Sequence, residues 1–119
     1  MDGAYYSFIH ESKIESDGLT VVPPEGLVPL KAKAWLDLTG RRDTDEKDIK
    51  KHKNDVFRLF QVIAPDTRVV LPGSIKDDLQ RFIQAVEADP PKSLKPFGLG
   101  ATKADEVIKT LRAIYELST

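Results

Sequence analysis

The sequence contains no cysteine. A chain without cysteine cannot build a disulfide scaffold, bind a metal through thiolates or use a cysteine nucleophile, and it suits a reducing compartment. It also lacks any apolar run near the ~20 residues of a membrane span, and its first residues show no basic and then apolar signal pattern. These absences predict a cytoplasmic protein with no membrane partner.

An excess of charge of either sign is absent as well. The 119 residues include 18 Lys and Arg against 19 Asp and Glu, a formal net charge of −1. This balance argues against nucleic-acid binding by bulk electrostatics, although a local basic face is compatible with it. The 40% hydrophobic and 31% charged residues are typical of a globular protein, and the length suits a single domain, 1–119.

The order of the patterns predicts an α+β fold, in which an N-terminal β-hairpin precedes about four α-helices. Residues 4–10, rich in Tyr and Phe, are predicted as one strand and residues 19–22 as the next, with Asp17-Gly18 as a turn between them. Residues 67–71 indicate a further short strand. The helices are expected at about 24–39, at about 44–63, from 74 to before Pro90, and from 102 almost to the C-terminus.

Local signals set these helix boundaries. Pro29 lacks the N–H of a helical hydrogen bond, so the helix from Pro24 either begins later or bends. Gly40 is expected as the C-cap of that helix. The expected N-caps of the following three helices are Thr44, Ser74 and Thr102.

A lysine interrupts the apolar stripe of the helix at 24–39. On a helical wheel Lys31 falls in the centre of the stripe, whereas Lys33 points away from it. A lysine in that position either snorkels beside Trp35 or serves as a functional ammonium aimed at a phosphate or an acidic partner. The residues of the stripe are Leu27, Leu30, Ala34, Trp35 and Leu38.

The helix at 44–63 carries the densest pattern of charge. His52 lies within its apolar stripe, and Asp48 and Asp55, seven residues apart, lie on one edge and are expected to face inward. One His and two Asp at this spacing match no strong ligand motif, which favours a satisfied core histidine, and aspartates paired with Lys31 or capping loops, over a metal site. The opposite face is basic, and it is either solvated or binds a phosphate backbone. That face consists of Lys47, Lys50, Lys51 and Arg58.

Two other acidic patterns are better explained by helix capping. Asp43 and Asp45 have the spacing of a metal-binding pair but stand at a helix start. Gly73-Ser74 followed by Asp77 and Asp78 faintly resembles a nucleotidyltransferase glycine–serine signature, but a Ser74 cap with an acidic first turn explains it better. The last two helices are predicted to serve mainly in packing. Their expected core residues are Ile75, Leu79, Phe82, Ile83, Val86, Val107, Ile108, Leu111, Ile114 and Tyr115.

Two stretches, residues 22–38 and 47–59, contain a longer pattern. Leu30-Lys31 with Ala34 is followed by Arg41-Arg42 and then by Lys47-Asp48 with Asp55. This order resembles the later half of nucleotidyltransferase-like proteins of the abortive-infection (AbiEii) type, a family of toxin–antitoxin systems. The resemblance covers roughly residues 4–63, and residues 64–119 would be a C-terminal helical extension.

The resemblance implies a nucleotide site. Lys31 would be its phosphate-binding or acid-pairing group and Asp48 its carboxylate, with His52 and Asp55 in support. The family's metal-binding acidic pair would lie on a sheet before the hairpin, so we expect a partial protein, either a truncated reading frame or a piece of a longer chain. Such a protein would be inactive alone in nucleotidyl transfer and would use Mg²⁺ and a nucleoside triphosphate only with the N-terminal half supplied.

Two functions of other classes remain open. The basic face of the helix at 44–63 suits a small module that contacts an acidic protein or RNA. The uncovered edge of the hairpin suits self-association into a homo-oligomer, because an exposed strand edge pairs readily with a second copy.

Overall fold

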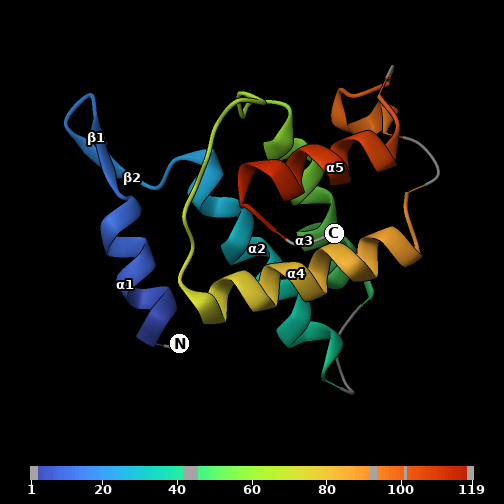
Figure 1. The fold of residues 1–119 in the computed structure, drawn as a ribbon, viewed down its shortest axis with the longest axis horizontal. Helices are drawn as coiled ribbons and strands as arrows, with labels where there is room; N and C mark the ends of the chain where they lie inside the picture. Colours follow the sequence, from blue (N-terminus) through green and yellow to red (C-terminus); the bar gives the residue numbers. More distant parts are fainter. Residues whose placement is uncertain (1–2, 42–45, 92–93, 101, 118–119) are drawn as a thin grey trace.

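The computed structural model describes residues 3–41, 46–91, 94–100 and 102–117. Within these ranges a short helix precedes a two-stranded hairpin, and four further α-helices follow it (Figure 1). The predicted α+β arrangement of a hairpin followed by four helices is therefore confirmed. The elements are α1 (Gly3–Ser12), β1 (Ile14–Ser16), β2 (Leu19–Val21), α2 (Pro24–Thr39), α3 (Glu46–Phe60), α4 (Gly73–Ala88), the 3-10 helix η1 (Lys95–Phe97) and α5 (Ala104–Ile114).

The helix α1 replaces the strand that we predicted at residues 4–10. Tyr5 and Phe8 are both buried, whereas the neighbouring Tyr6 is exposed. A separation of three residues places two side chains on one face of a helix but on opposite faces of a strand. The aromatic content favoured a strand, but packing of Tyr5 and Phe8 on the helical core outweighs that propensity.

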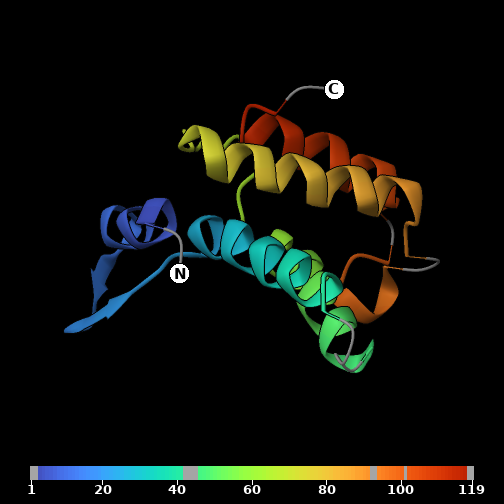
Figure 2. The same ribbon diagram turned by 90° about the horizontal axis from the view of Figure 1, so that it is seen from below.

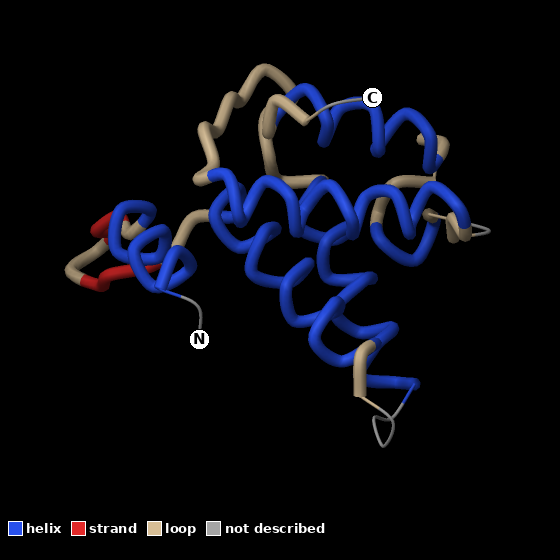
Figure 3. The backbone as a smooth tube through the Cα atoms, turned by 60° about the horizontal axis from the view of Figure 1, so that its bottom comes forward, coloured by secondary structure: helices blue, strands red, loops and turns tan. Residues whose placement is uncertain are grey.

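The hairpin turns at Asp17-Gly18 as predicted, but its first strand is β1. Ile14 pairs with Val21 in an antiparallel register, and positive φ angles of 51° and 80° at Asp17 and Gly18 fit a type I′ turn. Ile14, Val21 and Leu19 therefore share one face of the hairpin, and all three are exposed. The hairpin lies beside α1 at one end of the molecule (Figure 3), and self-association through it stays a prediction.

Helix α2 spans the predicted range and contains Pro29 without a break. Because Pro29 cannot donate to the carbonyl of Glu25, that carbonyl lacks its helical partner, and the hydroxyl of Tyr115 donates to it instead over 2.6 Å. Burial, and then the Glu25 carboxylate, raise the pKa of Tyr115 well above its ordinary value, so the hydroxyl stays protonated and remains a donor. Gly40 is the C-cap, as expected.

The helices form two layers, with α4 and α5 in one and α1, α2 and α3 in the other (Figure 2). The expected core residues of α4 and α5 are all buried between or beside these layers. The buried face of α2 is different from the predicted stripe, because it is centred on Val28 and Ala32, both 0% exposed. The predicted stripe is only half-buried. Helix α2 packs against both α3 and α4, so its most buried residues are those between the two contacts and not those of the stripe.

The remaining differences concern the ends of elements. Residues 67–71 form no strand; Val69 donates a single backbone hydrogen bond to Ile114 across 2.8 Å. The N-caps are Pro72 for α4 and Lys103 for α5, so neither Ser74 nor Thr102 caps its helix. The expectations for residues 42–45, which include the Thr44 cap and the Asp43 and Asp45 pair, fall outside the described residues. In the described ranges, no helix has the length and apolarity to cross a membrane.

Candidate functional site

Lys31 lies at the seam between α2 and α3, where it forms an ion pair. Its Nζ atom is 3.2 Å from Oδ2 of Asp55, and the two side chains are 33% and 20% exposed. Arg58 donates to the other carboxylate oxygen, Oδ1, also over 3.2 Å. One carboxylate therefore holds two cations, and we call Lys31, Asp55 and Arg58 the Lys31 cluster.

Lys33 lies away from the predicted stripe, as the helical wheel indicates, and on the side of α2 that meets α4. Its Nζ atom lies 3.2 Å from Asp37 and 3.9 Å from Asp78 of α4, and 5.7 Å from the centre of the Tyr5 ring. Successive residues of a helix differ by about 100°. Because the buried Ala32 stands between them, Lys31 is directed towards α3 and Lys33 towards α4.

Asp48 is exposed, so the prediction that it faces inward beside Asp55 is wrong. It belongs to the first turn of α3, where a carboxylate interacts favourably with the helix dipole. A spacing of seven residues aligns Asp48 with Asp55 along the helix, but only Asp55 reaches the part of α3 that packs against Lys31. The structure thus brings Lys31 together with Asp55, and leaves Asp48 accessible to solvent.

His52 is half-buried on α3, which agrees with its predicted place within the apolar stripe. Its Nδ1 atom is buried and has no hydrogen-bond partner in the described part of the chain, so it is not the satisfied core histidine that we expected. The same ranges contain no group of three His, Asp or Glu residues arranged to hold a metal ion.

The basic face of α3 is exposed along Lys47, Lys50 and Lys51. Arg58 is exposed as well, but it is held by Asp55 and lies 5.4 Å from the centre of the Phe97 ring. The exposed basic face therefore consists mainly of the three lysines in the first half of α3.

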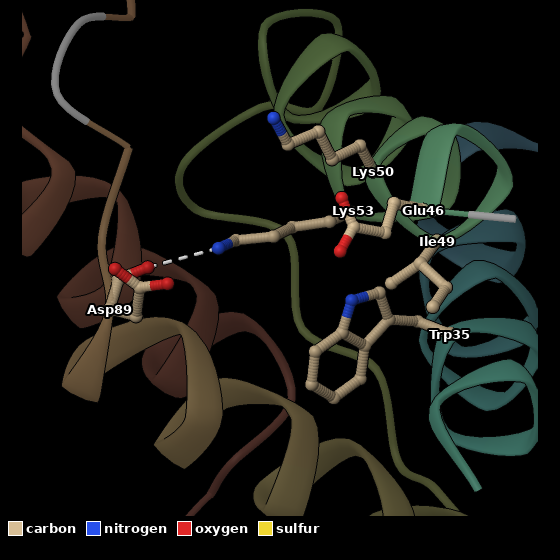
Figure 4. A pocket seen from close by; sticks show the side chains of 6 residues that line it. All are labelled: Trp35, Glu46, Ile49, Lys50, Lys53 and Asp89. Carbon is tan, nitrogen blue, oxygen red and sulfur yellow. Dashed lines mark hydrogen bonds between the residues drawn. The ribbon is translucent and has the colours of Figure 1, made fainter. Parts of the chain in front are cut away.

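A groove beside this face was not predicted from the sequence. Two adjoining hollows, of about 350 and 340 Å³, share Lys50, Lys53 and Asp89. Lys53 spans the groove and donates to the main-chain oxygen of Asp89, 2.9 Å away (Figure 4). We call this feature the Lys50 groove; its further lining residues are Trp35, Glu46 and Ile49 in the first hollow and Asn54, Pro90 and Pro91 in the second.

Sequence reasoning missed the groove because its walls are distant in the chain. The sequence pattern places Trp35 in a core stripe, and it indicates no partner for Lys53 because Asp89 lies 36 residues away. No short motif joins α2, α3 and the C-terminal end of α4, so only the packing of the three helices could reveal it.

Comparison with protein-family models, with curated proteins and with solved structures finds no match to this chain. The function must therefore be argued from the residues themselves. The two features available for that argument are the Lys31 cluster and the Lys50 groove.

Proposed function

We propose that this chain contributes the helical part of a nucleotidyltransferase-like nucleotide site, with Lys31 as the ammonium that meets the phosphates. The order of the Lys31, Lys47-Asp48 and Asp55 motifs supports it. The observation that carries it is the state of Lys31. Its ammonium stands at an accessible edge between two helices, paired with a carboxylate and not buried in the core.

The Lys31 cluster explains how such a lysine can exchange partners. An incoming phosphate would compete with Asp55 for the ammonium, because an exposed ion pair is worth only about 0–1 kcal/mol. Once Lys31 is released, Asp55 remains neutralised by Arg58 on its other oxygen. Without Arg58 the freed carboxylate would repel the phosphate. Asp48, exposed in the first turn of α3, lies two helical turns from Asp55 and outside the Lys31 cluster, so the proposal gives it no contact with Lys31.

The proposal assigns metal binding to a separate catalytic half. Transfer of a nucleotidyl group depends on divalent metal ions that neutralise developing charge and orient the phosphates, and those ions need a pair of acidic ligands. We assign that pair to a sheet outside these 119 residues. The 119 residues alone would then bind a nucleotide weakly and would not turn it over.

A nucleotide titration tests this assignment. With Mg²⁺ and radiolabelled nucleoside triphosphates, we expect no labelled product, together with millimolar binding seen as amide shifts around Lys31 in NMR spectra. Lys31→Met, which keeps the apolar stem, should weaken binding about threefold or more because one charged contact to phosphate is lost. Lys51→Met, on the exposed face of α3, is the matched control and should leave those shifts unchanged.

Turnover by a clean preparation would contradict the assignment of metal binding to another half. Equal affinities of the wild type and Lys31→Met, or no shift around Lys31 in either, would contradict the role of Lys31.

The exposed lysines of α3 favour a second candidate function, binding of single-stranded RNA. Three adjacent cations at Lys47, Lys50 and Lys51 would contact about three phosphates, for which the slope of log K against log salt is about −2. Fluorescence anisotropy with a labelled RNA across a salt series measures that slope. Weak dependence on salt, or no binding, would contradict this candidate.

A further inference from the structure

We propose that the Lys50 groove binds an acidic peptide segment that carries one large apolar side chain. The groove is distinct from the Lys31 cluster, and its occupant does not depend on the nucleotide-site proposal. The two hollows differ in chemistry: Trp35 and Ile49 line the first, and Asn54 lines the second with two prolines. Lys50 and Lys53 line both hollows, and Figure 4 shows them with the other residues of the first.

The first hollow is built to receive an apolar anchor. Trp35 is half-buried, and its ring meets Phe82 of α4 edge-on, with the ring centres 5.4 Å apart and the planes at 82°. This contact holds the indole as a rigid wall, and Ile49 supplies aliphatic surface beside it. An aromatic or leucine side chain that enters such a hollow buries apolar surface against a preformed partner, which is the usual basis of an interface anchor.

The cations are placed to bind carboxylates next to that anchor. An ammonium has three N–H donors, and Lys53 uses one of them on the Asp89 carbonyl, which fixes its position and leaves donors for a ligand. Lys50 is exposed on the same rim. Lys47 and Lys51 add positive potential nearby without lining the groove, which favours approach of an acidic segment.

The rest of the lining favours a peptide over a nucleic acid. The carboxylates of Glu46 and Asp89 also line the groove, and they would repel the regular series of phosphates in RNA. A peptide can place its acidic side chains at the lysines and keep neutral groups elsewhere. The Asn54 amide both donates and accepts, so it suits a main-chain peptide group, while Pro90 and Pro91 form a wall without N–H donors.

The intrinsic fluorescence of Trp35 provides a direct test, because this is the one tryptophan in the sequence. The probe is the peptide acetyl-Gly-Glu-Asp-Phe-Ser-Gly-Gly-amide, whose two carboxylates lie on one side of the Phe anchor, titrated into the 119-residue chain up to millimolar concentration. We expect a saturable change in the Trp35 emission. A peptide with Ala in place of Phe should bind about tenfold more weakly, since it lacks the apolar anchor.

Two charge reversals separate the groove from general electrostatics. Lys50→Glu should weaken binding of the acidic peptide about tenfold, because it places a carboxylate on the rim. Lys51→Glu changes the same charge on the next residue of α3, outside the groove, and should have an effect of about twofold or less. Lys31→Met should leave peptide binding unchanged, which keeps this test separate from that of the nucleotide site.

Several outcomes would overturn the proposal. No change in Trp35 emission at millimolar peptide would show that the groove does not take this ligand. Equal losses for Lys50→Glu and Lys51→Glu would show attraction by net charge alone. Single-stranded RNA that changes the Trp35 emission at lower concentration than the peptide does would assign the groove to nucleic acid instead.

Discussion

Replacing Phe82 with Ala is expected to lower the free energy of unfolding by about 3–5 kcal/mol, because it deletes a fully buried aromatic ring. Phe82 lies at the centre of the buried face of α4, is 1% exposed, and contacts Trp35 of the other helical layer. The substitution would leave a cavity between the two layers, where α2 and α4 meet. Urea denaturation followed by circular dichroism measures the loss as a lower midpoint with an unchanged slope.

Val70→Ala is the matched control for this substitution. Val70 is 83% exposed, so its truncation should change stability by no more than about 0.5 kcal/mol. A loss below 1.5 kcal/mol for Phe82→Ala, well under the usual range for such a truncation, would contradict the packing of α4 on α2. In the folded fraction of the variant, the emission of Trp35 should also change, because the indole loses its edge-on neighbour.

Tyr115→Phe is expected to lower the free energy of unfolding by about 1–3 kcal/mol, the cost of leaving a buried polar group without its partner. The substitution removes one oxygen and keeps the ring, which is 1% exposed. What is lost is the 2.6 Å hydrogen bond to the Glu25 carbonyl, the group that Pro29 cannot satisfy. Chemical denaturation of the two proteins side by side measures the difference.

A double-mutant cycle with Pro29→Ala tests the cause of that loss. Alanine restores the N–H that can donate to the Glu25 carbonyl, so Tyr115→Phe should cost about 1 kcal/mol less in the Pro29→Ala background. The cycle cancels the effect of Pro29 on the unfolded chain, which is common to both members of each pair. Equal costs in the two backgrounds would contradict the substitution of the Tyr115 hydroxyl for the missing helical donor.

Much of the fold could be predicted because the residues within and at the ends of single elements indicate their conformation. Helix α2 begins at Pro24 and ends before Gly40, as the residues at its two ends predict. Asp17 and Gly18 adopt the positive φ angles of a hairpin turn, which this pair of residues predicts. The cores of α4 and α5 were also predictable, because each presents one apolar stripe at helical spacing. At α1 the prediction was wrong, because it relied on the aromatic content, which favours a strand, and not on the helical spacing of Tyr5 and Phe8.

The candidate site was only partly predictable, because it depends on which neighbour each helix face meets. The wheel distinguished Lys31 from Lys33 by their distance from an apolar stripe, yet each lysine meets a carboxylate on a different helix. Asp48 and Asp55 looked equivalent by their spacing, and only Asp55 lies where α3 packs against α2. The pattern of residues within one helix does not predict which other helices pack against each of its faces.

The sequence by itself determined the Asp17-Gly18 turn, the extent of α2 and the residues of α4 and α5 that are apolar enough for burial. It also excluded thiol chemistry, since cysteine is absent. Only the tertiary structure decided the partners, because these join residues far apart in the chain. Lys53 meets the Asp89 carbonyl across 36 positions, and Tyr115 meets the Glu25 carbonyl across 90. Backbone dihedrals follow from a few neighbouring residues, whereas such contacts form only when whole helices pack, and the Lys50 groove is a product of that packing.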